Sequence, residues 1–498
     1  MTFVDWIIVG IYAISTLWLG HYFGRRQSST KEYFIGSGSM HPMLIGVSLF
    51  ATLLSTISYL AIPGEISGKG PIYLTNYIAY PFVFLVIGFV ILPVYMRNRV
   101  TSAYELLEER LGVSVRLLGA TMFLMLRLVW MALLVYLTAK AIAIMIGAGP
   151  EAVPWIVLVT GAFAVFYTTL GGLRAVVITD LIQTILLYGG ALLVIGTVTW
   201  KMGGFGWFPT EWQGDVWDAQ PIFSFDPATR ITVFGSLMSV FFWMTATMAG
   251  DQVSVQRFMA TENAPKARRA LAVQLTVSMI VGATLGLVGL ALLGYFQVHP
   301  ELLPEAGALN DQADKLFPHF IAFELPPVIT GLVVSGLFAA AMSSIDSGVN
   351  SITAVVMTDI LGRFDRKPAT AKESVSYARR LAMVIGAVVV LLSTFMDRIP
   401  GNFMAVTNKV VNLLTVPIAL LFIFALFVPF ANVKGVWAGT LASVSTALLI
   451  AFSGVIFGMD PVTGLPPVTF QWISPAAAVV GLTVGLIACK LFAKEKSS

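Results

Sequence analysis

The chain alternates between long apolar stretches and short polar connections. A helix needs about 20 apolar residues to cross the hydrocarbon core of a bilayer. Thirteen suitable stretches occur, at 4–23, 44–62, 73–95, 117–147, 151–169, 176–200, 231–249, 270–296, 327–361, 377–396, 408–430, 434–457 and 473–492. The pattern predicts an all-α integral membrane protein with about 13 transmembrane helices, in which residues 1–498 form a single transmembrane domain.

Composition excludes a soluble protein. Hydrophobic residues make up 57% of the chain and charged residues 11%, whereas soluble domains carry about 25% charged residues. The net charge of +4 is modest, so we expect no nucleic-acid partner. The single cysteine, Cys489, excludes an internal disulfide and a cysteine metal cluster. The first residues include neither a basic segment nor a small-residue cleavage site, so we expect no cleaved signal peptide.

The basic residues orient the chain in the cell (inner or plasma) membrane. If the N-terminus is outside, 22 Lys and Arg residues fall on the cytoplasmic side and 6 on the outer side. Arg257, between two predicted spans, is counted among the 22. The longer loops that would then be outer are 201–230, 297–317 and 458–472. Cytoplasmic loops carry an excess of Lys and Arg, so we expect the N-terminus outside and the C-terminus inside.

One apolar span contains a dense polar motif. In Phe338-Ala-Ala-Ala-Met-Ser-Ser-Ile-Asp346, two adjacent hydroxyls and a carboxylate interrupt the span 327–361. Small residues let helices approach closely in lipid, and a carboxylate inside a membrane usually marks an ion or substrate path. The motif indicates a site for a small cation at Ser343 and Ser344.

A second polar run lies in the span 44–62. Its hydroxyl residues are Thr52, Ser55, Thr56 and Ser58. They are followed by Pro63-Gly64, and the run indicates a helix that is interrupted in the middle of the membrane. An interrupted helix frees carbonyls that can coordinate a cation in a transporter, and a hard cation such as sodium prefers oxygen ligands. The alternative is that each hydroxyl bonds to a carbonyl one turn back in its own helix.

Ionisable residues also lie inside the predicted spans. Asp180 lies about one turn inside 176–200, and Arg127 lies near the middle of 117–147. Arg127 could pair with Asp180 or with Asp346 as a structural ion pair, or it could bind an anionic group of a substrate. Both interpretations stay open from the residues alone.

Catalytic motifs are missing from the sequence. It contains no Gly-x-x-x-x-Gly-Lys loop, no Gly-x-Ser-x-Gly turn and no His-Glu-x-x-His pair. We therefore expect neither an enzyme nor a cofactor. Either an ion gradient drives transport through this protein, or the protein is a passive pore.

Several segments resemble one known transporter family. They are Thr101–Gly112, Gly171–Gln183, Asp251–Arg257 and the pair Ser343–Ser344. In order and spacing they are similar to the sodium/solute symporters, which include carriers of sugars, proline, sialic acid, iodide, monocarboxylates and vitamins. The resemblance covers essentially the whole chain. It implies two inverted five-helix repeats, at about 44–200 and 231–457, with further helices at both ends.

The resemblance also implies ion ligands. Family sodium ligands correspond here to the carbonyls of Ala51, Leu54 and Ala340 and the hydroxyls of Ser343 and Ser344. A second ion site, which only some members have, corresponds to Asp180, Asp346 and Ser347. Where the two-sodium members have a serine, this chain has Asp346, so a second sodium ion or a proton is left open there.

The resemblance points to a solute other than a neutral sugar. Sugar carriers place Asn and aromatic side chains where this chain has Trp243–Met248. The sialic acid branch has an arginine where this chain has Trp130, and the nearest arginine is Arg127. Together with Lys409, Arg127 favours an anionic or zwitterionic, carboxylate-bearing solute. The remaining candidates for the substrate pocket are Ser55, Ser58, Asn76, Trp130 and Thr247.

We therefore expect a sodium-coupled secondary active symporter that takes up a small organic solute by alternating access and functions as a monomer. Its coupling ion is sodium, and its surroundings are membrane lipid. The alternative is a sodium-independent facilitator or channel for a small solute, which would not accumulate the solute against a gradient.

Overall fold

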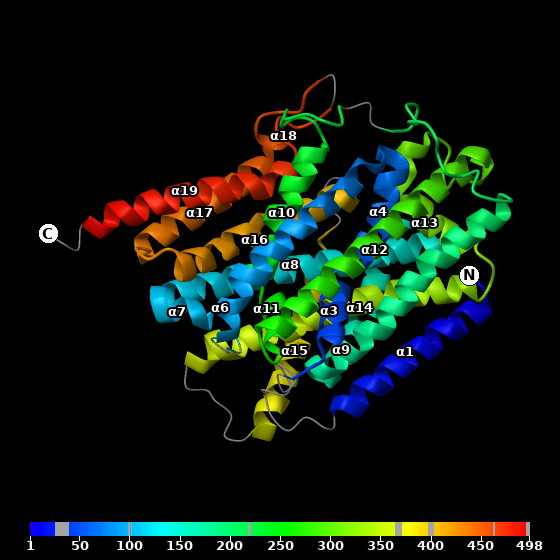
Figure 1. The fold of residues 1–498 in the computed structure, drawn as a ribbon. Coiled ribbons are helices and arrows are strands. Elements are labelled where there is room, and N and C mark those ends of the chain that lie inside the picture. The colour runs from blue at the N-terminus through cyan, green and yellow to red at the C-terminus, as the bar shows by residue number, and fades with distance from the viewer. Residues whose placement is uncertain are drawn as a thin grey trace.

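Long helices that lie roughly along one direction make up the structure (Figure 1). The computed structural model describes residues 1–24, 39–97, 100, 102–217, 221–363, 371–396, 403–461 and 464–494. Within these ranges it contains no strand. Helices satisfy every backbone polar group inside one segment, which hydrocarbon surroundings require.

The longer helices are α1 (Phe3–Gly24), α8 (Val113–Met145), α9 (Val153–Lys201), α10 (Val233–Gly250), α12 (Ala264–Val298), α14 (Ile329–Val355), α15 (Ala371–Ser393), α16 (Phe403–Phe427), α17 (Val433–Ala451) and α19 (Ile473–Lys494). The shorter helices are α3 (Pro42–Leu53), α4 (Thr56–Lys69), α5 (Tyr80–Val86), α6 (Leu92–Arg97), α7 (Glu105–Leu111), α11 (Gln252–Met259), α13 (Ala313–His319) and α18 (Ser453–Ile456). A 3₁₀ segment at Pro71–Ala79 and a π segment at Ile87–Ile91 join α5 and α6 into one apolar stretch.

The described residues contain 11 helices that are long and apolar enough to cross a membrane, or 12 if the bent pair α3 and α4 counts as one more. The predicted number of thirteen is therefore not confirmed. The difference lies in α9, where the apolar helix 150–166 is shorter than a full span. Helix continues through the predicted connection between 151–169 and 176–200, so that α9 has 49 residues.

The predicted span 44–62 is broken in its middle. The two halves α3 and α4 meet at an angle of 66°, because Leu54 and Ser55 adopt extended backbone conformations between them. Ser55 caps α4 by accepting a hydrogen bond from the Ser58 N–H over 3.3 Å. The break lies within the predicted span, and α4 continues through Pro63-Gly64 to Lys69.

A second break separates α10 from α11. Asp251 ends α10 and begins α11 with an extended backbone conformation. Its Oδ1 accepts a hydrogen bond from the Val253 N–H over 2.9 Å, which caps α11. The sequence predicted a span at 231–249 followed by a loop, and it missed the short helix that continues beyond the break.

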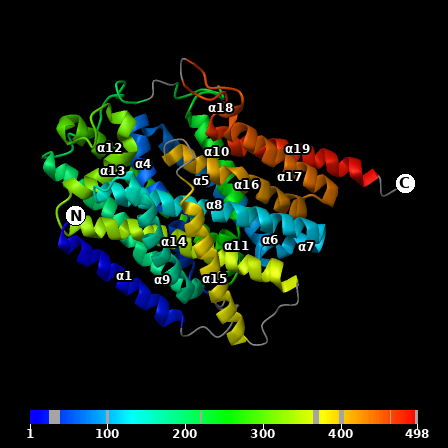
Figure 2. The same ribbon diagram turned by 180° about the vertical axis from the view of Figure 1, so that it is seen from behind.

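The helices pack in a bundle whose edges are formed by α1 on one side and by α17 and α19 on the other (Figures 1 and 2). α17 and α19 approach closely through glycines. A Cβ added to Gly439 would stand 2.7 Å from the carbonyl oxygen of Gly481 and 2.8 Å from the Cα of Gly485. α14 lies inside the bundle, where it packs against α9, α1, α8 and α3.

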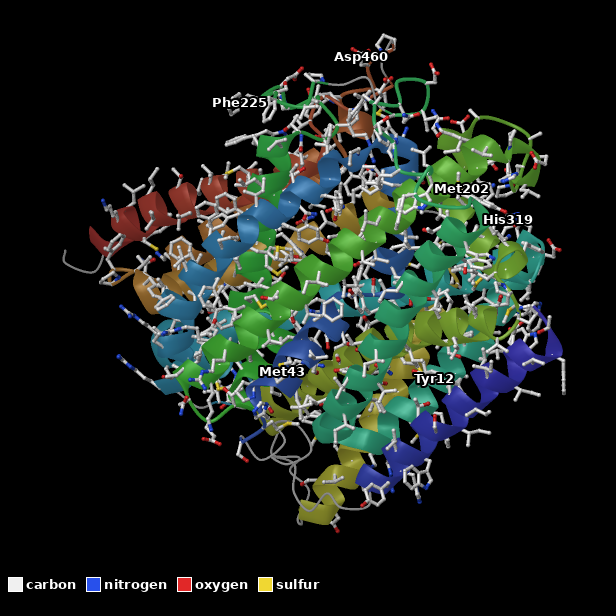
Figure 3. All side chains as sticks on the ribbon, turned by 45° about the vertical axis from the view of Figure 1, so that its right-hand side comes forward. Tyr12, Met43, Met202, Phe225, His319 and Asp460 are labelled. Carbon is white, nitrogen blue, oxygen red and sulfur yellow. The ribbon has the colours of Figure 1, made fainter. Side chains whose placement is uncertain are left out.

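The connections gather at the two ends of the bundle. Met202, Phe225, His319 and Asp460 lie toward one end, and Met43 lies toward the other (Figure 3). The N- and C-termini also lie at opposite ends (Figures 1 and 2). This arrangement agrees with the expected division of the loops between the two sides of the membrane.

Candidate functional site

The first helix break lies against the middle of α14. Ser344 donates a hydrogen bond from its Oγ to the carbonyl oxygen of Thr52, in the last turn of α3, over 3.2 Å. Thr56, at the start of α4, donates from its Oγ1 to the carbonyl oxygen of Leu337 over 3.0 Å. Both halves of the broken helix are therefore bonded to α14 in the protein interior.

These contacts bring together the two groups of predicted sodium ligands. The last helical hydrogen bond of α3 runs from the Leu54 N–H to the Phe50 carbonyl over 2.8 Å, so the following carbonyls, including those of Ala51 and Leu54, lie at the open end of the helix. Across from them, the remaining predicted ligands belong to α14 and are buried: Ala340, Ser343 and Ser344. The arrangement places hydroxyl and carbonyl oxygens on two adjoining elements, which suits a small hard cation.

Asp180 of α9 is fully buried beside this region, and two serines hold its carboxylate. Ser343 donates to Oδ1 over 2.5 Å, and Ser48 of α3 donates to Oδ2 over 2.5 Å. The Nη2 atom of Arg257 lies 3.6 Å from Oδ2. A hydroxyl that donates its proton retains lone pairs, so the Ser343 oxygen can still serve as a ligand.

Arg257 of α11 has no solvent exposure, and its guanidinium group bonds to three neighbours. Nε donates to Ser48 Oγ over 2.9 Å, Nη2 to Ser347 Oγ over 2.5 Å and Nη1 to the Val253 carbonyl over 3.3 Å. Counting Arg257 among the cytoplasmic loop residues was wrong. α11 follows the second helix break and is buried in the protein, where these oxygen atoms satisfy the charge.

The predicted second ion site spans α9 and α14. Asp346 is 1% exposed, and Ser347 Oγ lies 2.9 Å from the Thr52 hydroxyl. Arg257 donates a hydrogen bond to Ser347 of this predicted site and lies 3.6 Å from Asp180.

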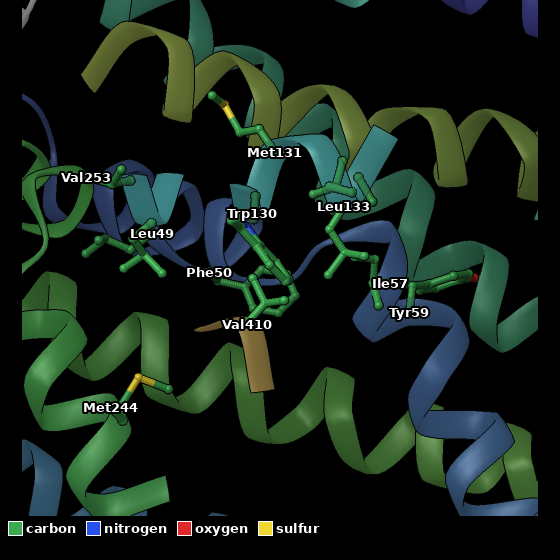
Figure 4. Packing of buried hydrophobic residues seen from close by; sticks show 14 of the residues in the cluster. Leu49, Phe50, Ile57, Tyr59, Trp130, Met131, Leu133, Met244, Val253 and Val410 are labelled. Carbon is green, nitrogen blue, oxygen red and sulfur yellow. The ribbon is translucent and has the colours of Figure 1, made fainter. Parts of the chain in front are cut away.

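A cavity of about 150 Å³ adjoins the first helix break. The break itself, α4, the Pro71–Ala79 segment, α8, α10 and α16 form its wall. Aromatic side chains supply much of this wall: Phe50, Tyr73, Tyr77, Tyr80, Trp130 and Trp243. Trp130 is directed from α8 toward Phe50 and Val410 (Figure 4).

Most of the predicted substrate residues line this cavity. They are Ser58, Asn76, Arg127, Trp130 and Thr247. Leu54, from the predicted sodium set, also belongs to the lining. Ser55 does not, because its hydroxyl caps α4. Lys409 is also outside the lining, although its neighbour Asn408 on α16 is part of it.

Arg127 forms an ion pair with Asp251 in the wall of the cavity. The sequence left open a pair with Asp180 or Asp346 or contact with an anionic substrate group, and it did not consider Asp251 as a partner. Both partners face the cavity with small exposed fractions, 8% for Arg127 and 5% for Asp251. In the described structure the Nε atom of Arg127 has no hydrogen-bond partner.

Sequence reasoning missed the roles of Asp251 and Arg257. Hydropathy assigned both residues to a polar loop, because the segment 250–269 contains several charged residues. A signal was available, since the segment Asp251–Arg257 is part of the family resemblance. An acidic and a basic residue that directly follow an apolar span can therefore belong to a short buried helix.

Ion pairs also join elements at the two ends of the bundle. At one end, Arg230 binds both carboxylate oxygens of Glu65 in α4, over 2.5 and 2.7 Å. At the other end, Arg116 binds Asp359 and Glu108, each over 2.6 Å. The first pair holds α4, the second half of the broken helix, and the second pair holds the π segment Val356–Ile360 that follows α14.

Comparison with known proteins gives one consistent family. Residues 33–443 match the model of the Sodium:solute symporter family. The sodium/sialic acid symporter NanT of Aliivibrio fischeri is 30% identical over 453 residues, which cover 90% of this chain and 87% of that protein. The sodium/sialic acid symporter SiaT of Proteus mirabilis is also 30% identical, with 99% of this chain and 96% of that protein covered.

Solved structures agree with the sequence relatives. A substrate-bound, outward-open Na⁺-coupled sialic acid symporter has a TM-score of 0.83 and 25% sequence identity, with 98% of each chain covered. The transporter Mhp1 of the nucleobase-cation-symport-1 family has a TM-score of 0.56 at 12% identity, over 93% of this chain and 95% of that chain, and so shares the fold. The family match and these relatives describe transporters rather than enzymes, and the many apolar helices are those of a multi-pass membrane protein. The chain belongs to the sodium:solute symporter family.

Proposed function

We propose that the chain is a secondary active symporter that couples the inward flow of sodium to uptake of a small, carboxylate-bearing organic solute. The observation that carries this proposal is the contact between the broken helix and α14. In this contact the two groups of predicted sodium ligands lie next to each other beside a cavity. Leu54 is both a predicted sodium ligand and part of the cavity wall. Sodium symporters commonly place ion and solute at such an interrupted helix.

In the proposed mechanism, sodium bridges α3 and α14. Its ligands are the carbonyls of Ala51, Leu54 and Ala340 and the hydroxyls of Ser343 and Ser344. Bound sodium stabilises the state in which the two helices are in contact, and thereby completes the cavity wall at Leu54. Separation of the helices removes ligands and releases sodium. The ion shifts this equilibrium only through its different affinity for the two states.

The proposed topology is two inverted repeats, at about 44–200 and 231–457, with the N-terminus outside and the C-terminus inside. Two observations support it. Each repeat begins with a broken helix, α3 with α4 in the first and α10 with α11 in the second. The termini also lie at opposite ends of the bundle (Figure 1). One chain provides both the ion ligands and the cavity, which supports function as a monomer.

The proposed solute carries a carboxylate that binds Arg127. A guanidinium group has five N–H donors, and the pair with Asp251 leaves others for a ligand. The relatives named for sialic acid are named for a solute that carries a carboxylate. The sialic acid branch has an arginine at the position of Trp130, so in this chain we assign the carboxylate to Arg127 instead.

A second cation at Asp180, Asp346 and Ser347 stays a prediction. Arg257 already places a positive charge within this set, which favours one sodium ion per transport cycle. We expect the sodium dependence of uptake to have a Hill coefficient close to one. A coefficient well above one would indicate that a second sodium ion binds cooperatively.

The proposal is tested by uptake into proteoliposomes with and without an inward sodium gradient, using labelled amino acids, monocarboxylates, sugars and vitamins. We expect sodium-dependent accumulation in the wild type and a strong loss of apparent sodium affinity, about tenfold or more, when Ser343→Ala and Ser344→Ala are combined, since two oxygen ligands are removed. The matched control is Ser335→Ala, a buried serine of α14 that bonds to its own helix at Gly331 over 2.8 Å.

The alternative function, a sodium-independent facilitator, predicts a different result. Uptake would then be the same with and without sodium and would stop at equal concentrations. Unchanged sodium affinity in the double serine variant would defeat the assigned ion site even if uptake itself depends on sodium.

A further inference from the structure

We infer that the solute is a small zwitterion, whose carboxylate binds Arg127 and whose cationic group binds Asp251. This inference rests on the proposed function and narrows its substrate class. It follows from three properties of the cavity: its charge, its aromatic wall and its volume.

The charge of the cavity wall is balanced. Among the residues that line the cavity in the described structure, Arg127 and Asp251 are the only ones with a charged side chain. They come from α8 and from the break between α10 and α11. A solute with only a negative charge would bind next to the Asp251 carboxylate, and a solute with only a positive charge would bind next to the Arg127 guanidinium. A solute that carries both charges avoids either repulsion.

Both partners of this ion pair retain capacity for a ligand. Asp251 accepts one hydrogen bond from the Val253 N–H and one from Arg127, whereas a carboxylate offers about four lone-pair sites. Arg127 donates to Asp251, and its Nε atom has no partner in the described structure. The pair therefore provides an acceptor, Asp251, for the ammonium group of a zwitterion and, beside it, a donor, Arg127, for its carboxylate.

The aromatic wall favours a compact cationic group. Trp130, Trp243, Tyr73, Tyr77 and Tyr80 all contribute to it. The faces of aromatic rings attract ammonium groups, and most strongly those of tryptophan, by about 0.5–2 kcal/mol. Such a wall also accepts an apolar ring or methyl groups attached to the nitrogen, because these apolar groups are then removed from water.

The volume of the cavity limits the size of the solute. A cavity of about 150 Å³ accommodates a molecule of about the size of benzene. Proline and trimethylammonioacetate are in this range, whereas sialic acid is much larger. The likeness to sialic acid symporters therefore does not transfer their substrate to this chain.

The test uses two sets of similar-shaped compounds that differ in charge. The first set is proline, cyclopentanecarboxylate and pyrrolidine. The second is trimethylammonioacetate, 3,3-dimethylbutyrate and choline. Thermal unfolding of the purified full chain is measured with each compound in the presence of sodium, because a ligand that binds the folded state raises the midpoint temperature. We expect at least one zwitterion to raise the midpoint at concentrations where its singly charged analogues do not.

Two variants test the assignment of the charges. Asp251→Asn removes the negative charge but keeps a good N-cap for α11, so α11 is expected to remain folded. It should weaken zwitterion binding by about tenfold or more and reduce the discrimination against the anionic analogue. Arg127→Gln should reduce the discrimination against the cationic analogue. Ser335→Ala, outside the cavity lining, should change neither.

Specific outcomes overturn the inference. It fails if neither zwitterion raises the midpoint, if an anionic analogue or N-acetylneuraminate stabilises the protein more than both zwitterions, or if Asp251→Asn leaves the charge preference unchanged. These failures are distinguishable from failure of the proposed function. Sodium-dependent accumulation of a solute that is not a zwitterion would retain the symporter and reject only the substrate class.

Discussion

Arg257 shows how a single buried charge depends on its surroundings. Its guanidinium group has no solvent exposure and bonds to Ser48, Ser347 and the Val253 carbonyl, with Asp180 at 3.6 Å. Removing one partner of a buried ion pair is strongly destabilising, because the other charge remains in a medium that solvates it poorly. The hydroxyl groups around Arg257 therefore contribute to stability as well as to the proposed ion site.

We predict that Asp180→Asn destabilises the protein, by about 3–5 kcal/mol as for other buried pairs that lose one partner. The double variant Asp180→Asn with Arg257→Gln should be less destabilised than the sum of the two single variants, because it leaves no unpaired charge. Thermal unfolding of all four proteins in detergent measures this. Additive losses would show that the two charges do not interact.

Sequence reasoning identified many of these residues but not their partners. Ser343, Ser344, Asp180 and Arg127 were recognisable because polar groups inside an apolar span are costly and need a function. Their pairings were not, because hydropathy describes neighbours along the chain, whereas the Arg127–Asp251 pair joins positions 124 residues apart. Such pairs depend on how the helices pack.

At the scale of the elements, two broken helices organise the site. In each break, a side-chain oxygen caps the second half: Ser55 for α4 and Asp251 for α11. The sequence indicated that the span 44–62 is interrupted, and the structure shows that α4 continues through Pro63-Gly64. A membrane helix can tolerate proline where its neighbours satisfy the freed backbone groups, so a capping residue marks this break better than proline does.

Glycines control the distance between α17 and α19. We predict that Gly439→Ala destabilises this pair, by about 1–3 kcal/mol, because its Cβ would meet backbone atoms of Gly481 and Gly485. The control is Gly196→Ala in α9, where the added Cβ meets nothing within 4 Å and alanine favours the helix. Thermal unfolding should show a lower midpoint for the first variant only. Equal midpoints would mean that the two helices separate without cost.

At the scale of the whole molecule, the two ends of the bundle are closed by different ion pairs. Glu65 with Arg230 connects α4 to the segment before α10. Arg116 with Asp359 and Glu108 connects α8 to α7 and to the π segment Val356–Ile360 that follows α14. Alternating access requires that only one end opens at a time. The two sets of contacts are therefore candidates for opposing each other in the transport cycle.

The sidedness of the bundle can be measured by cysteine labelling, because the native Cys489 is fully buried. We predict that Phe205→Cys reacts with a membrane-impermeant maleimide in intact cells, since residue 205 lies in a predicted outer loop and is 73% exposed. Arg269→Cys, at an exposed position of the predicted inner side, should react only after the membrane is permeabilised. The reverse pattern would invert the proposed topology.

The buried position of Arg257 also has a consequence for biosynthesis. Ser48 and Asp180 precede Arg257 in the chain, but Ser347 follows it and emerges from the ribosome later. An arginine without its partners costs about 2.5–3.5 kcal/mol at the centre of an inserting helix. During translation α11 should therefore stay near the membrane surface until α14 arrives. In nascent chains that end before α14, the guanidinium group of Arg257 would lack its Ser347 partner.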